Sequence, residues 1–220
     1  RQMHGESVVI RLLRKDGTVP DFQQLGFSEA LLGRFMGLLE QPNGILLVTG
    51  PTGSGKTTTL YGALRHLNQP TRKILTVEDP VEYELEGINQ LQVKPQIGLD
   101  FARALRALVR QDPDVIMIGE MRDLETARIA VQSAMTGHLV LSTLHTNDAL
   151  SSVNRLLDMG VEGYLVTSTV IGIVAQRLVR QLCPHCRESY EVLPELATEL
   201  RLPAQESGAA AKLYRAVGCG

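Results

Sequence analysis

Short apolar runs alternate with amphipathic segments along most of the chain. The runs are rich in leucine and β-branched residues, which is typical of buried strands. Between them, apolar residues recur at the spacing of one helix face. Buried strands separated by helices predict an α/β fold with a mostly parallel sheet covered by helices on both faces. The predicted strands are 45–49, 73–77, 115–118 and 138–145.

Residues that cap helices mark where most of the predicted helices begin. Ser28 precedes a segment whose apolar residues share one face, and an aspartate stands in the same position before each of several later helices. We expect these residues to accept hydrogen bonds from the first turns of their helices. The aspartates are Asp100, Asp123 and Asp148. Further expected elements are a strand at 7–13, a long core helix from Gly163 to Leu182 and a short helix from Lys212 to Val217.

Residues 50–57 match the phosphate-binding pattern G-x-x-x-x-G-K-[ST] at every fixed position. The loop lies between a predicted strand and a predicted helix, so backbone N–H groups and the helix dipole favour an anion there. Lys56 is expected to reach the β- and γ-phosphates of a nucleotide, and Thr57 to bind magnesium. A chance glycine-rich turn is the alternative, which the flanking strand and helix disfavour. The expected nucleotide-binding residues are Gly50, Pro51, Thr52, Gly53, Ser54, Gly55, Lys56, Thr57 and Thr58.

Two carboxylates and a histidine stand at the ends of predicted strands. Glu78 follows the run 73–77, Glu120 follows 115–118, and His145 ends the last predicted strand. The carboxyl ends of parallel strands meet at one sheet edge, so we expect these side chains beside the phosphate loop. A lone histidine at a strand end is more often a packed or capping residue than a catalytic one. Only the polar residues at the same strand ends support a catalytic role for His145. Together these features predict a domain that binds and hydrolyses a nucleoside triphosphate.

Three arginines share one face of the helix predicted after Asp100. Arg103, Arg106 and Arg110 are spaced at i, i+3 and i+7. A solvated basic face explains this spacing, and spacing alone favours that interpretation. Arginines that reach phosphates, including those of a neighbouring subunit, are the functional alternative.

Composition excludes some functions. The 220 residues carry a net charge of −2 and only 4% aromatic residues, which disfavours a nucleic-acid surface. Polar residues interrupt the apolar stretch 164–179, so we do not expect a membrane span. Residue 1 is Arg and no signal peptide is visible, so we expect a part of a longer protein.

Of 3 cysteines, Cys183 and Cys186 form a C-x-x-C pair, which predicts a metal site in a reducing compartment rather than a disulfide.

Four sequence blocks resemble, in this order, the Walker A loop, Asp box, Walker B and His box of the type II/type IV secretion ATPases. The resemblance covers nearly the whole chain and is closest to the branch that powers type II secretion. It implies a RecA-like P-loop ATPase fold that assembles into a homo-hexamer. In that family Walker B ends in Gly-Glu, so Gly119 in place of the usual aspartate is a family trait. The blocks are 50–61, 76–83, 110–123 and 138–149.

The resemblance also implies residue roles. Glu78 would polarise the attacking water, Glu120 would hold the magnesium shell through water, and His145 would sense the γ-phosphate. Three arginines are implied as further catalytic residues, one in an N-terminal ATPase subdomain and two near the subunit boundary. They are Arg11, Arg106 and Arg110, respectively.

The cysteines match a zinc site of the same family. Its secretion and pilus-assembly branch carries two C-x-x-C pairs, which pilus-retraction ATPases lack. Cys183, Cys186 and Cys219 match three of these ligands, and the fourth is expected beyond Gly220, so the zinc site is expected to be incomplete. The implied domains are the end of a PAS-like subdomain (1–18), a linker (19–27), the RecA-like domain (28–182) and a truncated zinc–cysteine subdomain (183–220).

The implied function is ATP hydrolysis that drives pseudopilus assembly and protein export by a type II secretion system. The implied partners are an inner-membrane platform and its cytoplasmic adaptor, with no nucleic acid and no direct membrane insertion. The implied location is the cytoplasm, peripheral to a bacterial inner membrane. Two alternatives stay open: a type IV pilus-assembly ATPase, and a nucleotide-gated assembly module with little turnover.

Overall fold

A computed structural model describes residues 20–202 and 212–219. The chain divides into two compact units, the first ending at Arg177 and the second beginning at Leu178. Arg11, the predicted strand at 7–13 and the expected PAS-like segment lie outside the described residues. Within the described part of the chain, no helix is long and apolar enough to cross a membrane.

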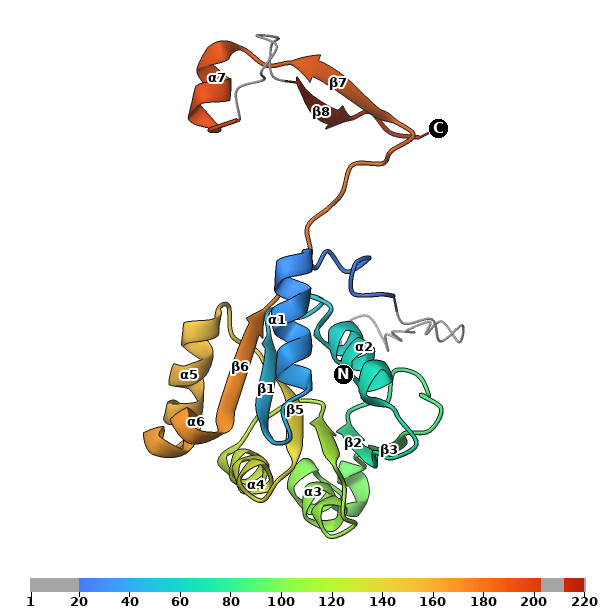
Figure 1. Cartoon of the computed structure of the whole chain (residues 1–220), viewed down its shortest axis with the longest axis vertical. Helices are drawn as coiled ribbons and strands as arrows, with labels where there is room; N and C mark the ends of the chain where they lie inside the picture. Colours follow the sequence, from blue (N-terminus) through green and yellow to red (C-terminus); the bar gives the residue numbers. More distant parts are fainter. Residues whose placement is uncertain (1–19, 203–211, 220) are drawn as a thin grey trace, which may run out of the picture. The chain divides into compact units, whose positions relative to one another are not determined.

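The first unit is built on a six-stranded sheet in the order β3-β2-β4-β5-β1-β6, and every neighbouring pair is parallel (Figure 1). The central strands β1, β2, β4 and β5 are buried along their whole length. Continuous burial explains why these strands are continuous apolar runs rather than alternating ones. The strands are β1 (Gly44–Thr49), β2 (Ile74–Glu78), β3 (Asn89–Gln92), β4 (Val115–Ile118), β5 (Leu139–Leu144) and β6 (Val170–Ala175).

The predicted helix caps are confirmed. The side chains of Ser28, Asp100, Asp123 and Asp148 each accept a hydrogen bond from a backbone N–H in the first turn of the following helix. Each cap satisfies a donor that the helix leaves without an internal partner. The helices are α1 (Glu29–Leu39), α2 (Lys56–Leu67), α3 (Phe101–Val109), α4 (Leu124–Met135), α5 (Ala149–Asp158) and α6 (Gly163–Thr169), with a 3₁₀ turn η1 at Pro95–Ile97.

Helices cover both faces of the sheet, as predicted (Figure 1). Leu46 and Val48 of β1 pack with Phe35 of α1 and with residues of α2 in one apolar cluster. Ile45 and Leu47 point the other way, into a cluster with residues of α3, α4, α5 and α6. Successive strand residues face opposite sides, so one strand contributes to both cores.

The predicted long helix from Gly163 to Leu182 is wrong. The helix ends at Thr169, and Val170–Ala175 forms β6, which pairs in parallel with β1. The run Val-Ile-Gly-Ile-Val is β-branched, and its glycine lies where a Cβ would meet Leu38 Cδ1 at 2.5 Å. A short apolar run has no periodicity that separates strand from helix, and β-branched content decides for the strand here.

The second unit is an antiparallel hairpin of β7 (Arg187–Glu191) and β8 (Lys212–Ala216), with the short helix α7 (Pro194–Glu199) between them in sequence. The predicted helix from Lys212 to Val217 is therefore wrong. Cross-strand side chains stabilise the strand instead: Arg215 pairs with Glu188 at 3.2 Å, and the Arg187 guanidinium lies 4.7 Å from the Tyr214 ring centre.

Candidate active site

The phosphate loop joins β1 to the N-terminus of α2, as the sequence predicts. Gly53 and Gly55 have φ of 75° and 84°, a left-handed conformation that favours glycine. A Cβ on Gly50 would lie 2.3 Å from the Gln176 carbonyl oxygen and 2.6 Å from Ser54 Oγ. The backbone therefore turns closely around the space in front of the helix, where the N-terminus of α2 favours an anion.

Lys56 and Ser54 fit a bound phosphate. Lys56 is buried, and its Nζ donates to the carbonyl oxygens of Gly50 (2.9 Å) and Pro51 (3.0 Å). Burial lowers the pKa of Lys56, and the nearby Glu120 carboxylate opposes this shift. Ser54 Oγ is buried without a hydrogen-bond partner among the described residues. Buried hydroxyls are rarely left without a partner, so this atom fits a ligand oxygen at the loop.

Thr57 and Thr58 follow the loop lysine in the first turn of α2. Thr57 is exposed and Thr58 is half-buried. An exposed hydroxyl at this position is accessible to a hydrated magnesium ion, which keeps most of its waters in such sites. When bound, magnesium would supply neutralisation of the phosphate charge.

Glu120 and His145 lie together at the ends of β4 and β5. His145 Nε2 is 3.4 Å from Glu120 Oε2, and Arg122 pairs with Glu120 Oε1. The Glu120 side chain is 13% exposed, whereas that of His145 is 51% exposed. Glu120 also acts electrostatically on Lys56, so this carboxylate shares the sheet edge of the phosphate loop. The predicted roles of Glu120 and His145 in hydrolysis stay predictions.

Hydroxyl groups also connect these strand ends. Thr143 Oγ1 donates to the Gly119 carbonyl (2.7 Å), and Ser142 Oγ donates to that of Ile118 (2.9 Å). Thr49, at the end of β1, donates to the Leu144 carbonyl at 3.1 Å. Polar residues inside otherwise apolar strands were the available signal, because a buried hydroxyl requires a partner.

Gln176, after the end of β6, bonds to β1 and α2, the elements on either side of the phosphate loop, and these contacts were not predicted. Its backbone N–H donates to the Thr49 carbonyl at 2.8 Å, and its Oε1 accepts from Thr59 Oγ1 of α2 at 2.7 Å. Because the sequence predicted a helix here, no functional contact was expected.

Glu78 has a different environment from Glu120. It is the last residue of β2 and is only 2% exposed. Its Oε1 accepts from Thr76 Oγ1 (2.6 Å) and Gln90 Nε2 (3.1 Å), and its Oε2 accepts from the Tyr61 hydroxyl. The predicted role of Glu78 in polarising the attacking water stays a prediction.

The predicted arginine face is exposed. Arg106 pairs with Glu125 of α4, and Arg103 donates to the Gly98 carbonyl at 2.9 Å. Arg110 is exposed and caps the C-terminus of α3. An exposed set of arginines is compatible with both the solvated face and the subunit-boundary interpretation, which stays a prediction for Arg106 and Arg110.

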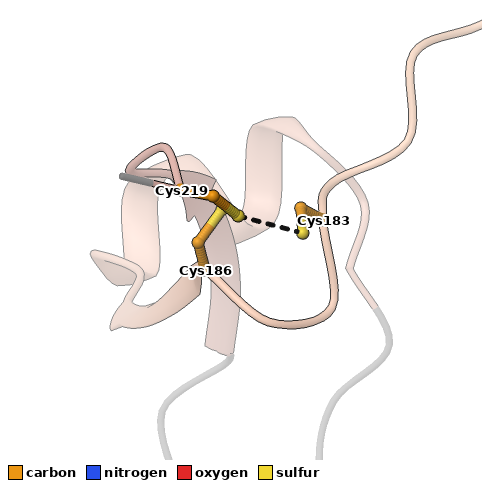
Figure 2. Close-up of side chains that lie close together, drawn as sticks. All are labelled: Cys183, Cys186 and Cys219. Carbon is orange, nitrogen blue, oxygen red and sulfur yellow. Dashed lines mark hydrogen bonds between the residues drawn. The ribbon is translucent and has the colours of Figure 1, made fainter.

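The cysteines converge in the second unit (Figure 2). The sulfur atoms of Cys183, Cys186 and Cys219 all lie within 4.8 Å of one another, and Cys183 Sγ is 3.6 Å from Cys219 Sγ. Tetrahedral zinc–thiolate bonds of ~2.3 Å place sulfur atoms ~3.8 Å apart. Hydrogen bonds lower the pKa of Cys183, and the bond from the His185 backbone contributes most to this shift. The three thiols therefore fit a zinc site that has one further position.

A phosphate loop at the end of a parallel strand, with carboxylates delivered by neighbouring strands, defines a P-loop nucleotide-binding α/β domain. A family model described as "Type II/IV secretion system protein" matches residues 2–220. The crystal structure of the pilus retraction motor PilT with bound ADP has a TM-score of 0.68 and 40% identity, covering 76% of this chain and 50% of that one. The chain belongs to the type II/IV secretion system protein family, and the predicted RecA-like P-loop fold is confirmed.

Two curated relatives from different branches of the family are similar to this chain over nearly its whole length. A type II secretion system protein E of Xanthomonas campestris pv. campestris is 65% identical over 212 residues, which cover 96% of this chain and 37% of the relative. The type IV pilus assembly ATPase PilB of Thermus thermophilus is 50% identical over 218 residues, which cover 99% of this chain and 24% of the relative. The chain thus spans well under half the length of these curated relatives.

Proposed function

We propose that this chain is the nucleotide-hydrolysing part of an ATPase that drives protein export by a type II secretion system. The carrying observation is one sheet edge that holds the phosphate loop, with buried Lys56 and the unpartnered Ser54 hydroxyl, beside the Glu120–His145 pair. Family membership supports ATP as the nucleotide, as does the ADP bound to PilT.

In the proposed mechanism the protein binds and orients the nucleotide and forms no covalent bond to it. Loop N–H groups, Lys56 and Ser54 bind and orient the β- and γ-phosphates, and His145 senses the γ-phosphate. Thr57 and Glu120 would hold magnesium, which would neutralise part of the phosphate charge. Positioning and charge stabilisation are enough for phosphoryl transfer, because its transition state is loose and negatively charged.

The type II system is proposed over pilus assembly because the chain is 65% identical to a type II protein and 50% identical to PilB. The cysteine cluster supports zinc in the second unit. We further propose a homo-hexamer in which Arg106 and Arg110 lie near the subunit boundary, working at the inner membrane with a platform and its adaptor. The domain boundaries predicted from the sequence belong to the same proposal.

The test measures ATP binding and phosphate release by the full-length protein and its Lys56→Ala variant. We expect Lys56→Ala to lose turnover and most of its ATP affinity, because the loop loses its buried cation. Arg128→Ala is the matched control, since Arg128 lies in α4 and pairs with Glu162. Tight ATP binding by the wild type without turnover would favour the nucleotide-gated module, and unchanged turnover in Lys56→Ala would contradict the site.

A further inference from the structure

Glu78 is a buried carboxylate whose two oxygens both accept hydrogen bonds from neighbouring side chains. Tyr61 of α2, Thr76 of β2 and Gln90 of β3 are the donors. With 2% of its surface exposed, Glu78 has little access for a water molecule in this arrangement. A group that polarises water must reach it within hydrogen-bond distance, so the geometry favours another role.

Tyr61 connects this carboxylate to the phosphate loop. It lies on α2, the helix that begins with Lys56, and is fully buried. Its hydroxyl donates to Glu78 and accepts from the Glu82 backbone N–H at 3.3 Å and from Gln90 Nε2 at 3.4 Å. Burial, followed by the bond to Glu78, raises the pKa of Tyr61, so the hydroxyl stays protonated and keeps donating.

Gln90 of β3 bonds to the chain that follows Glu82. Its Nε2 also donates to the Tyr83 carbonyl (3.2 Å), and its Oε1 accepts from the Leu85 N–H (2.7 Å). On the same strand, Gln92 Oε1 accepts from the Val81 N–H at 3.3 Å. The chain that leaves β2 is therefore bonded along its length to side chains of α2 and β3.

We propose that Glu78, Tyr61 and Gln90 form a clamp that positions the acidic segment Asp79–Glu82 relative to the phosphate-loop helix. The clamp rests on the ATP hydrolysis proposed above. Glu78 is then a positioning residue that acts through Tyr61 and Gln90 and does not itself touch the attacking water. The segment carries the carboxylates Asp79 and Glu82 at the sheet edge that β2 shares with β4.

The clamp predicts an effect on turnover more than on nucleotide binding. The phosphate loop and Lys56 stay intact when a clamp bond is lost, so ATP affinity is expected to change by less than about twofold. Displacing a reacting group by about 1 Å costs about 100-fold in rate. A residue that only supports the fold would lower thermal stability without separating kcat from the ATP dissociation constant.

The experiment compares kcat, the ATP dissociation constant and the melting temperature of full-length variants. Tyr61→Phe removes the hydroxyl that bonds Glu78, and Tyr83→Phe is its matched control. Tyr83 packs edge-on against Tyr61 with ring centres 4.6 Å apart, but its hydroxyl is not a described donor to Glu78. We expect Tyr61→Phe to lower kcat at least tenfold relative to Tyr83→Phe, with ATP affinity preserved.

A second comparison separates positioning from catalysis at Glu78 itself. Glu78→Gln keeps an oxygen that accepts from Thr76 and Gln90, whereas Glu78→Ala removes the whole acceptor. We expect Glu78→Gln to be at least tenfold more active than Glu78→Ala. A water-polarising base would make both variants equally inactive, since neither has a basic carboxylate, at a cost of about 100- to 10,000-fold.

Each outcome decides the proposal. A difference smaller than tenfold in either comparison overturns the clamp. If Glu78→Ala does not fold, Glu78→Gln is judged against the wild type, and a loss beyond 100-fold overturns the clamp. Failure of the proposed function is a separate result: the wild type would not hydrolyse ATP, or Lys56→Ala would keep full turnover.

Discussion

Removing the buried hydroxyl of Ser54 should stabilise the nucleotide-free protein and weaken nucleotide binding. Ser54 Oγ has no hydrogen-bond partner among the described residues, although it is shielded from solvent. An unsatisfied buried polar group costs about 1–3 kcal/mol. Ser54→Ala removes this cost and leaves only a small void, so we expect the nucleotide-free protein to gain about 1 kcal/mol. For a domain of this size that gain raises Tm by about 2–4 °C.

Nucleotide binding should change in the opposite direction. If a phosphate oxygen is the missing partner, Ser54→Ala loses a hydrogen bond to a charged group, worth about 1.5–3 kcal/mol. ADP affinity should then fall by about 10- to 100-fold. Calorimetric titration with ADP and thermal unfolding without nucleotide measure both effects on the same samples.

Ser133→Ala is the matched control. Ser133 is also buried, but its Oγ donates to the Ile129 carbonyl at 2.8 Å on α4. We expect this variant to keep ADP affinity and to gain no stability. The reasoning is refuted if Ser54→Ala destabilises the nucleotide-free protein and binds ADP within twofold of the wild type.

Three further predictions address charge, metal and packing. Burial lowers the pKa of Lys56 below its ordinary value of 10.5. ATP affinity should therefore be unchanged near neutral pH and should begin to decrease at a pH below 10.5, because the side chain loses its charge there. Lys56→Arg should show no decrease in that pH range, because arginine stays charged. Cys219→Ser should weaken zinc binding by more than about tenfold in a competition with a chromophoric chelator, while ATP affinity in the first unit stays unchanged; equal zinc affinity would contradict the thiol cluster. Phe35→Ala should cost about 3–5 kcal/mol in urea unfolding because Phe35 is 1% exposed, and Leu31→Ala on the same helix, where Leu31 is 44% exposed, should cost far less.

The central sheet was predictable because its strands are buried on both faces. A strand such as β4, Val-Ile-Met-Ile, has no polar position and is short and rich in β-branched residues, which together predict a buried strand. The helix caps were predictable for a similar local reason, since an aspartate before an amphipathic segment satisfies the same N–H groups in any protein.

The edges of the sheet were not predictable in this way. β3 reads Asn-Gln-Leu-Gln, which resembles a polar loop, and its strand character comes from pairing with β2. The apolar run of β6 has no periodicity that separates helix from strand, so its β-branched residues and its pairing with β1 together favour the strand. Propensity carries little information at such positions because tertiary contacts determine the outcome.

Some residues of the candidate site were predictable from the sequence and others were not. The phosphate loop, Glu120 and His145 were predicted because each follows a recognisable strand. Gln90 and Gln176 were missed because each contacts the site from an element that lies elsewhere in the sequence, and Tyr61 was missed because its bond to Glu78 depends on how α2 packs on β2. Glu78 was predicted to be near the site, but its burial could not be inferred without knowing that Tyr61 and Gln90 cover it.

Phosphate release under single-turnover conditions tests the central claim most directly. The full-length wild type and Glu120→Gln are each loaded with magnesium and ATP, and bound nucleotide and released phosphate are measured in the same samples. We expect both proteins to bind ATP with similar affinity and only the wild type to release phosphate at an appreciable rate. Equal phosphate release by Glu120→Gln, or none by a wild type that binds ATP, would contradict hydrolysis at this sheet edge.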